Sequence, residues 1–369
     1  MAANSQAPLA TIVFPILAAA FALAAPFLGV GSPHTPLPAA LVVDAVMIAV
    51  MLGAIFAAVH HADVIACRLG EPGGTLVLTL AVTIIEVALI ESVVLEHNSS
   101  PGLARDTVFS AVMIVCNGLV GLCVLLGGLQ HREQEFQTSG AGVYLSLLGA
   151  LSVLTLVLPN YTLTEGPYFS TAQLIFVSII TVMLYVTFLF IQTSRHADYF
   201  RIPYKAADAN GFDSDYPSNR SVALSVVLLL VALGGVILIA EKFAIVMEAG
   251  VDEIGAPQAV VGIIIAMVVM APESITAVRA ARRDVLQKSL NVALGSSLAT
   301  IGLTVPAVAV TNVVLGKQLA LGLSGRDTLL LALTLFLSVL TFGTGRTNIL
   351  SGLIHLLVFA TFVFLIFIP

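Results

Sequence analysis

Two glutamates lie inside long apolar segments, one in each half of the chain. Glu86 follows the apolar run 76–85, and Glu273 follows the apolar run 260–272. A carboxylate deep in hydrocarbon is costly unless it faces a cavity, a partner or a cation, so such a residue is a functional-site candidate. A carboxylate in that setting is neutralised by a bound cation or by a proton. Glu86 and Glu273 are therefore predicted to be cation and proton sites, and to be ligands of a transported metal ion.

Other oxygen-bearing groups accompany both glutamates. Thr83 lies three residues before Glu86, on the same helical face. Pro272 donates no backbone N–H, which leaves a carbonyl oxygen free one turn earlier. The next apolar segment in each half supplies further candidate ligands: Asn117, Ser296, Ser297 and Thr300. Carboxylate, hydroxyl, amide and carbonyl oxygens together suit a hard cation such as calcium, sodium or potassium.

The charge of the two glutamates predicts a mechanism. Two buried carboxylates close together cannot both stay ionised without a counter-charge. One divalent cation or two protons would neutralise the pair, so the cation and the protons would compete for one site. Competition of this kind, coupled to alternating access, is antiport.

The composition places these residues in a membrane. The chain has 369 residues, of which 59% are hydrophobic and only 10% are charged, and its mean hydropathy is +1.06. Ordinary soluble domains are about 25% charged. Because a spanning helix needs about 20 apolar residues, we expect an all-α polytopic protein with eleven transmembrane helices. Their predicted ranges are 9–30, 38–64, 74–96, 106–129, 142–159, 171–192, 221–247, 257–279, 289–313, 327–343 and 347–368.

The polar stretch 193–220 divides these helices into two sets. We expect an extra N-terminal helix within residues 1–37, a five-helix repeat over 38–192, a cytoplasmic linker over 193–220, and a second five-helix repeat over 221–369. Because five is odd, the two repeats enter the membrane from opposite sides. Glu86 lies 12 residues after Gly74, and Glu273 lies 16 residues after Pro257, which is about 18 and 24 Å along a helix. Both carboxylates are thus predicted near the membrane centre, as an inverted repeat requires at its substrate site.

Basic residues predict the orientation. With a cytoplasmic N-terminus, eleven Lys and Arg lie on the inner side and three, Arg105, Lys317 and Arg326, on the outer side. The C-terminus is then outside. We expect the chain to be a multi-pass protein of a bacterial inner membrane.

Two ionisable residues near helix ends are candidates for gates or proton relays. Asp63 lies at the inner end of the second predicted helix, and Glu241 lies towards the outer end of the seventh. The simpler alternative is interfacial anchoring, with Lys242 pairing a nearby carboxylate. His355 is expected to be a hydrogen-bonded core residue. The acidic linker segment 208–215 lacks the spacing of an EF-hand loop.

These residues resemble the alpha repeats of the calcium/cation antiporter superfamily, and most closely its bacterial ChaA-like, proton-coupled branch. The likeness covers the second to the eleventh helix. It is carried by Thr83-Ile-Ile-Glu86, by Ala271-Pro-Glu273 and by the polar segment 289–306, with support from Ala240-Glu241 and residues 190–196. The resemblance implies eleven helices, central glutamates that bind cations and protons, and alternating access.

The sequence departs from the superfamily pattern Gly-Asn-Ala-x-Glu. The equivalent segments are Val82-Thr-Ile-Ile-Glu86 and Val269-Met-Ala-Pro-Glu273. Each segment lacks the amide ligand and the flexible glycine of that pattern, so sodium and potassium remain possible substrates beside calcium. Asn117 stands for the family's asparagine after the first repeat, and Thr300 lies near the matching place in the second.

Two other classes of protein are weighed against the antiporter. A membrane enzyme would need His-Glu-x-x-His, Gly-x-Ser-x-Gly or paired catalytic aspartates, and none of these patterns stands out. His60, His61 and Asp63 are residues of types that can bind a metal ion. A cation channel is the main alternative, but the chain has no repeated filter loop. We therefore expect an ion-coupled antiporter, not an enzyme. We expect no cofactor and no nucleic-acid partner, only inorganic cations, protons and membrane lipid. Since a single chain can build the site, oligomerisation is not required.

Overall fold

The protein is described from a computed structural model, which covers residues 8–28, 37–70, 73–95, 101–201, 217–316 and 318–368. The acidic linker segment 208–215 lies outside these described residues. Within them, eleven helical stretches are long and apolar enough to span a membrane. Each of the eleven predicted spans corresponds to one of them, so the prediction of eleven helices is confirmed.

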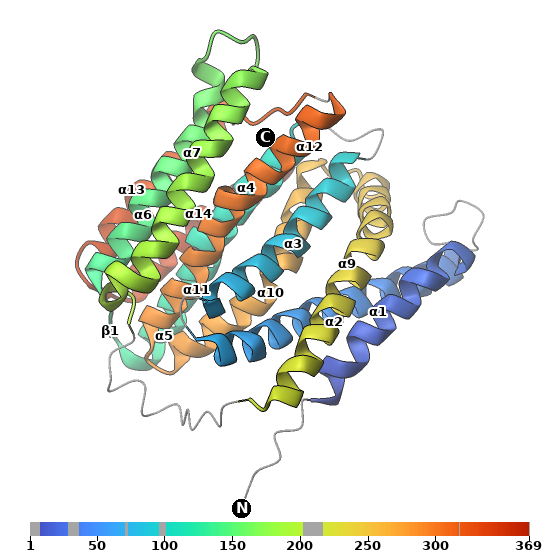
Figure 1. Cartoon of the computed structure of the whole chain (residues 1–369). Helices are drawn as coiled ribbons and strands as arrows, with labels where there is room; N and C mark the ends of the chain where they lie inside the picture. The colour runs from blue at the N-terminus through green and yellow to red at the C-terminus, as the bar shows by residue number, and fades with distance from the viewer. Residues whose placement is uncertain are drawn as a thin grey trace, which may run out of the picture. The chain divides into compact units, whose positions relative to one another are not determined.

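The chain divides into two compact units (Figure 1). The first unit holds residues 1–99 and 214–255, and the second holds residues 100–213 and 256–369. The first unit contains four described helices: α1 (Leu9–Leu28), α2 (Leu37–Leu69), α3 (Gly73–Leu95) and α9 (Asn219–Glu253). In this unit α2 and α9 pack along each other, α1 packs on both, and α3 contacts both.

Histidine hydrogen bonds tie three helices of the first unit together. The His61 ring lies 3.2 Å from the Ser225 hydroxyl on α9 and 2.9 Å from the Thr11 carbonyl on α1. His61 is buried. Its two ring nitrogens are therefore used to join helices across an apolar core.

The second unit contains the remaining helices. They are α4 (Leu103–Met113), α5 (Val120–His131), α6 (Thr138–Ser152), α7 (Thr171–Phe190), α10 (Ala259–Arg282), α11 (Leu286–Ala299), α12 (Val305–Leu315), α13 (Gly325–Phe342) and α14 (Ile349–Phe367). Two-residue strands β1 (Gln134–Glu135) and β2 (Arg346–Thr347) pair antiparallel at one end of the unit. Short 3₁₀ turns occupy Leu158–Tyr161 and Ala197–Tyr199.

Several spans of the second unit contain a π-helical segment. These segments are Ile114–Leu119, Val153–Val157, Ile191–Arg195 and Thr300–Thr304. The first joins α4 to α5 and the last joins α11 to α12, so each pair of helices forms one span. A π segment carries one extra residue in a turn and is frequent at functional sites.

The two spans singled out by their small and polar residues are the most buried of the eleven. In the span Leu103–His131, 83% of the most apolar 18-residue window is buried, and in Leu286–Leu315 61% is buried, against 22–44% for the others. Small residues explain this, because they let neighbouring backbones approach closely. A side chain at Gly302, for example, would collide with the Tyr185 ring.

Candidate cation and proton site

Glu86 is a buried acid in the middle of a helix of the first unit. It lies 13 residues after Gly73, where α3 begins (86 minus 73), which is about 20 Å along the helix axis. Its exposed fraction is 4%, and that of Thr83 is 7%. The Thr83 hydroxyl has no hydrogen-bond partner among the described residues. A buried acid beside a buried hydroxyl is the local chemistry that the sequence predicts for a cation ligand pair.

Glu273 lies about as far along a helix of the second unit. It lies 14 residues after Ala259, where α10 begins (273 minus 259), or about 21 Å along the axis. The residue is half-buried. The helix continues through Pro272, and the Thr276 hydroxyl donates to the Pro272 carbonyl at 3.1 Å. The proline therefore does not break the helix in this conformation.

The helices that carry the other predicted ligands pack around α10. Within the second unit α10 contacts α4, α5, α11 and the π segment Ile114–Leu119. Asn117 and Thr300 both lie 14 residues after the start of their spans, at Leu103 and Leu286. Each is also in a π segment. The parallel supports the pairing of these two spans that the sequence suggested.

Asn117 is held by two side chains of neighbouring helices. Its amide nitrogen donates to the Thr334 hydroxyl at 2.8 Å, and its oxygen lies 3.1 Å from Nδ1 of His355. The other ring nitrogen of His355 is 3.1 Å from the Thr341 hydroxyl. His355 is fully buried and hydrogen-bonded, as expected. A cation bound by Asn117 would share the amide oxygen with His355, because that oxygen has two lone pairs, and the role of Asn117 as a ligand stays a prediction.

The predicted hydroxyl ligands on α11 and at the start of the π segment that follows it differ in how they are satisfied. Thr300 donates to the Ser296 carbonyl at 3.2 Å. Ser297 is fully buried, and its hydroxyl has no hydrogen-bond partner among the described residues. Buried polar groups are nearly always hydrogen-bonded. Ser297 is therefore the hydroxyl on this helix that most needs a ligand.

The two predicted gate residues are exposed in the first unit. The Glu241 side chain is 65% exposed and lies 3.4 Å from Lys242, its neighbour in sequence. Asp63 is also exposed. An exposed ion pair contributes little to stability. The roles of Glu241 and Asp63 as gates or proton relays stay predictions. No group of three or more His, Cys, Asp and Glu side chains in the described ranges could hold a metal.

Sequence reasoning missed two arginine–aspartate pairs at one end of the second unit. Arg105–Asp106 lies in the first turn of α4, and Arg326–Asp327 lies in the first turn of α13. A signal was present, because Arg-Asp-Thr occurs at both places, at residues 105–107 and 326–328.

The fold and these side chains define a class of protein. Eleven candidate spans with acidic, amide and hydroxyl groups buried inside them are the arrangement of a polytopic secondary transporter. The family model described as "Sodium/calcium exchanger protein" matches residues 39–194 and 224–368. The chain belongs to this exchanger family, whose members are transporters and not enzymes, and it is a multi-pass membrane protein.

Individual relatives support this assignment. The chain is 47% identical over 321 residues to the "Putative ionic transporter y4hA" of Sinorhizobium fredii, covering 86% of this chain and 87% of the relative. It is 36% identical over 360 residues to the sodium-potassium/proton antiporter ChaA of Escherichia coli, covering 97% and 96%. The resemblance predicted from the sequence is thereby confirmed.

A solved structure shows the same fold. The crystal structure of the selenium-substituted Ca2+/H+ antiporter YfkE matches with a TM-score of 0.70 at 18% identity, over 97% of this chain and 100% of that one. The predicted fold class is confirmed by this match.

Proposed function

We propose that this chain is a secondary antiporter that exchanges an inorganic cation for protons by alternating access, with Glu86 and Glu273 as its central cation and proton sites. The observation that carries the proposal is the pair of acids 13 and 14 residues into their helices, in a chain of the exchanger family. A carboxylate at that depth must be neutralised. A cation and protons neutralise the two acids in turn, which couples the two flows.

Hydroxyl and amide oxygens complete the proposed site. Thr83 supports Glu86, while Asn117, Ser296, Ser297 and Thr300 lie on helices packed against the helix of Glu273. The missing partner of the Ser297 hydroxyl favours this role. Neutral oxygens bind hard cations without adding charge. Glu241 and Asp63 are proposed as relays towards the two mouths.

The relatives favour a site open to monovalent ions. The Escherichia coli relative is named a sodium-potassium/proton antiporter, while the structural match is named a Ca2+/H+ antiporter. The departures from Gly-Asn before both glutamates agree with relaxed selectivity, because each removes an amide ligand. We propose sodium and potassium as substrates beside calcium.

We also propose that residues 38–192 and 221–369 are inverted repeats in a bacterial inner membrane, with a cytoplasmic N-terminus. The ranges matched by the family model, 39–194 and 224–368, are close to these limits. The distribution of Lys and Arg supports the orientation.

Neutralising either glutamate tests the site. Glu86→Gln and Glu273→Gln keep the side-chain shape and remove the charge that binds the cation and releases the proton. Each should abolish cation-driven proton movement in proteoliposomes and leave the melting temperature near that of the parent. The matched control is Glu135→Gln, because Glu135 is an exposed partner of Arg346 at 2.8 Å. Near-normal exchange by either buried variant would contradict the assignment.

A further inference from the structure

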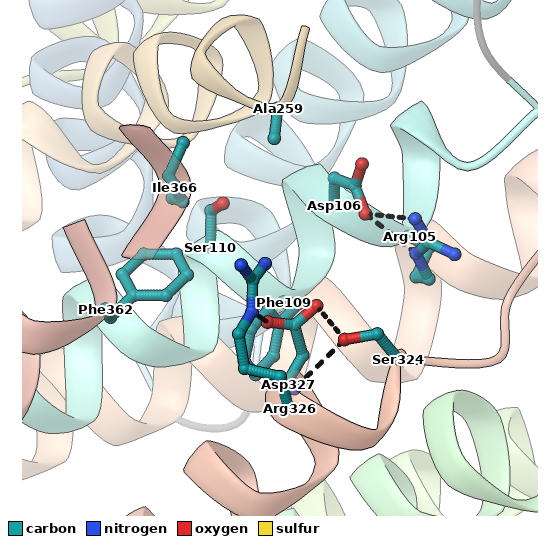
Figure 2. A pocket seen from close by; sticks show the side chains of 10 residues that line it. All are labelled: Arg105, Asp106, Phe109, Ser110, Ala259, Ser324, Arg326, Asp327, Phe362 and Ile366. Atoms are coloured by element: carbon teal, nitrogen blue, oxygen red, sulfur yellow. Dashed lines mark hydrogen bonds and ion pairs between the residues drawn. The ribbon is translucent and has the colours of Figure 1, made fainter. Parts of the chain in front are cut away.

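The two arginine–aspartate pairs line a pocket of about 440 Å³ in the second unit (Figure 2). The pocket lies where α4, α10 and α13 begin and α14 ends, and we call it the Arg–Asp pocket. Its polar lining is Arg105, Asp106, Ser110, Ser324, Arg326 and Asp327. Since a water molecule occupies about 30 Å³, the pocket has room for roughly fifteen waters. Phe109, Phe362 and Ile366 supply an apolar wall.

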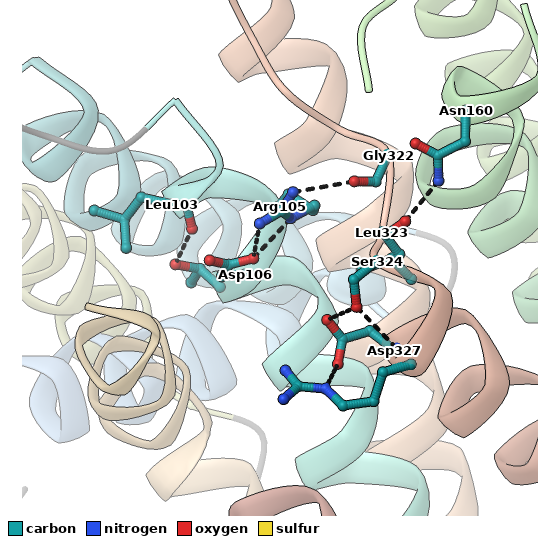
Figure 3. Close-up of polar contacts among 10 residues, drawn as sticks. Leu103, Arg105, Asp106, Asn160, Gly322, Leu323, Ser324 and Asp327 are labelled. Atoms are coloured by element: carbon teal, nitrogen blue, oxygen red, sulfur yellow. Dashed lines mark hydrogen bonds and ion pairs between the residues drawn. The ribbon is translucent and has the colours of Figure 1, made fainter. Parts of the chain in front are cut away.

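Each arginine is held in place by its own aspartate and by a distant carbonyl. Arg105 donates to the Gly322 carbonyl at 3.0 Å (Figure 3), and Arg326 donates to the Leu365 carbonyl at 2.7 Å. Asp327 uses both carboxylate oxygens, one for Arg326 at 3.1 Å and one for the Ser324 hydroxyl at 2.7 Å. The four charged groups sum to zero. The arginines are therefore fixed counter-charges of the pocket.

Asp106 has an oxygen left over. Nε and Nη2 of Arg105 both approach Oδ1 of Asp106, at 2.7 Å each. Oδ2 accepts no hydrogen bond from the described residues, and the Asp106 side chain is 24% exposed. A carboxylate bound through one oxygen keeps the other for a ligand.

Ser110 supplies a second oxygen with no partner. It lies one helical turn below Asp106 on the same face of α4, and it also lines the Arg–Asp pocket. Its exposed fraction is only 2%, and its hydroxyl bonds to none of the described residues. A hydroxyl in a pocket wall takes its hydrogen bonds from water or from a ligand in the pocket. Because the Arg–Asp pocket adjoins Ser110, a ligand there can satisfy it.

We propose that the Arg–Asp pocket binds a partly hydrated inorganic cation through Asp106 Oδ2 and the Ser110 hydroxyl, as an access site additional to the buried glutamates. The ligands are hard oxygens, as such a cation prefers. The pocket is large enough for the ion to keep much of its water. Because the fixed charges cancel, binding is weak, which suits an ion that must leave again. The identification of the ion as a transported cation rests on the proposed function.

An anion beside Arg326 is the competing occupant. Nη2 of Arg326 makes no hydrogen bond within the described part of the chain, but the Arg326 side chain is 37% exposed and water reaches it. The Ser110 residue is only 2% exposed, much less than Arg326. The unsatisfied groups at the buried end of the pocket are therefore oxygens, which favours a cation.

Thiol protection tests the proposal without requiring transport. Ala259 lines the Arg–Asp pocket, so Ala259→Cys places a thiol there. The purified full-length protein also carries Cys67→Ser, because Cys67 is the exposed one of the three native cysteines. A neutral maleimide then modifies the introduced thiol in sodium, potassium, calcium or choline chloride at equal ionic strength. Sodium, potassium or calcium should slow modification several-fold relative to choline.

Variants separate a cation site from a structural effect. Asp106→Asn should lower the affinity for the protective cation at least about tenfold, as expected when a charged ligand is lost. Ser110→Ala, which leaves both ion pairs intact, should lower this affinity as well. The matched control is Asp198→Asn, because Asp198 pairs with Arg201 at 2.8 Å but is 81% exposed. This control should change nothing.

The proposal is overturned by three results. These are equal modification rates in all salts, rates that follow the anion when sulfate replaces chloride, and an introduced thiol that does not react. Repeating the measurement in Glu273→Gln protein separates the two proposals. Protection that persists there, while exchange is lost, supports the pocket site independently of the glutamate site. Loss of protection in every background removes the pocket site and leaves the antiporter proposal standing.

Discussion

Gly352 sets the distance between α5 and α14, the helix whose His355 contacts Asn117, and Gly352→Ala should be strongly destabilising. A Cβ atom at Gly352 would lie 2.6 Å from the Leu125 backbone nitrogen and 2.9 Å from the Gly121 carbonyl oxygen. Ordinary contacts begin at 3.4 Å. The obstacles are backbone atoms, so α14 must move away from α5 by up to the difference, 0.8 Å.

The movement has two costs. Forcing an extra methyl into a packed interface costs about 1–3 kcal/mol. The same shift stretches the 3.1 Å contact between His355 and Asn117 beyond the roughly 3.5 Å limit of a hydrogen bond, and losing that bond costs about 1 kcal/mol. The free energy of unfolding should fall by about 2–4 kcal/mol in total. The melting temperature should then fall by roughly 5 °C.

Thermal unfolding in detergent measures this effect. Cys116 and Cys123 are buried, so in a Cys67→Ser background their reaction with a thiol dye reports unfolding of the second unit. Gly142→Ala is the matched control, because a Cβ atom there would meet nothing within 4 Å. The control should be neutral or stabilising by up to about 1 kcal/mol. If the Gly352→Ala protein melts within 1 °C of the control protein, the close approach of the two helices is wrong.

Two further variants address the site directly. Ser297→Ala removes a hydroxyl that has no partner in the described structure, so the melting temperature should hold while the apparent cation affinity in exchange falls several-fold; unchanged affinity would make this hydroxyl dispensable. Glu241→Gln should change the rate or the pH dependence of exchange more than the cation affinity, and an unchanged pH profile would reduce Glu241 to an interfacial residue paired with Lys242.

The eleven spans could be predicted from the sequence because hydropathy and length decide them. Their ends could not be predicted as well. The seventh helix was predicted over 221–247 but runs from Asn219 to Glu253, because polar residues at its end continue the helix beyond the apolar run. The fully buried histidine, His355, was also predicted, since a lone polar residue in an apolar span must find partners.

Other features depend on contacts between distant parts of the chain. The pairing of Gln134 with Thr347 joins two short loops that carry no strand pattern. The π segment around Asn117 has no sequence signature that separates it from an α-helix. The Arg–Asp pocket needed the spatial meeting of α4 and α13, although the repeated Arg-Asp-Thr was a usable signal. The roles of Glu86 and Glu273 rest on depth and chemistry, and they remain for experiment.

Proton movement driven by a cation gradient distinguishes antiport from simple conduction. Proteoliposomes containing the purified protein and an internal pH dye receive sodium, potassium or calcium outside in turn, with the membrane potential clamped near zero. We expect an added cation to raise the internal pH as protons leave in exchange, and we expect no response from the Glu86→Gln and Glu273→Gln proteins. Cation entry without proton movement that rises when a negative-inside potential is imposed in place of the clamp, from protein shown to be folded, would contradict antiport and indicate a channel.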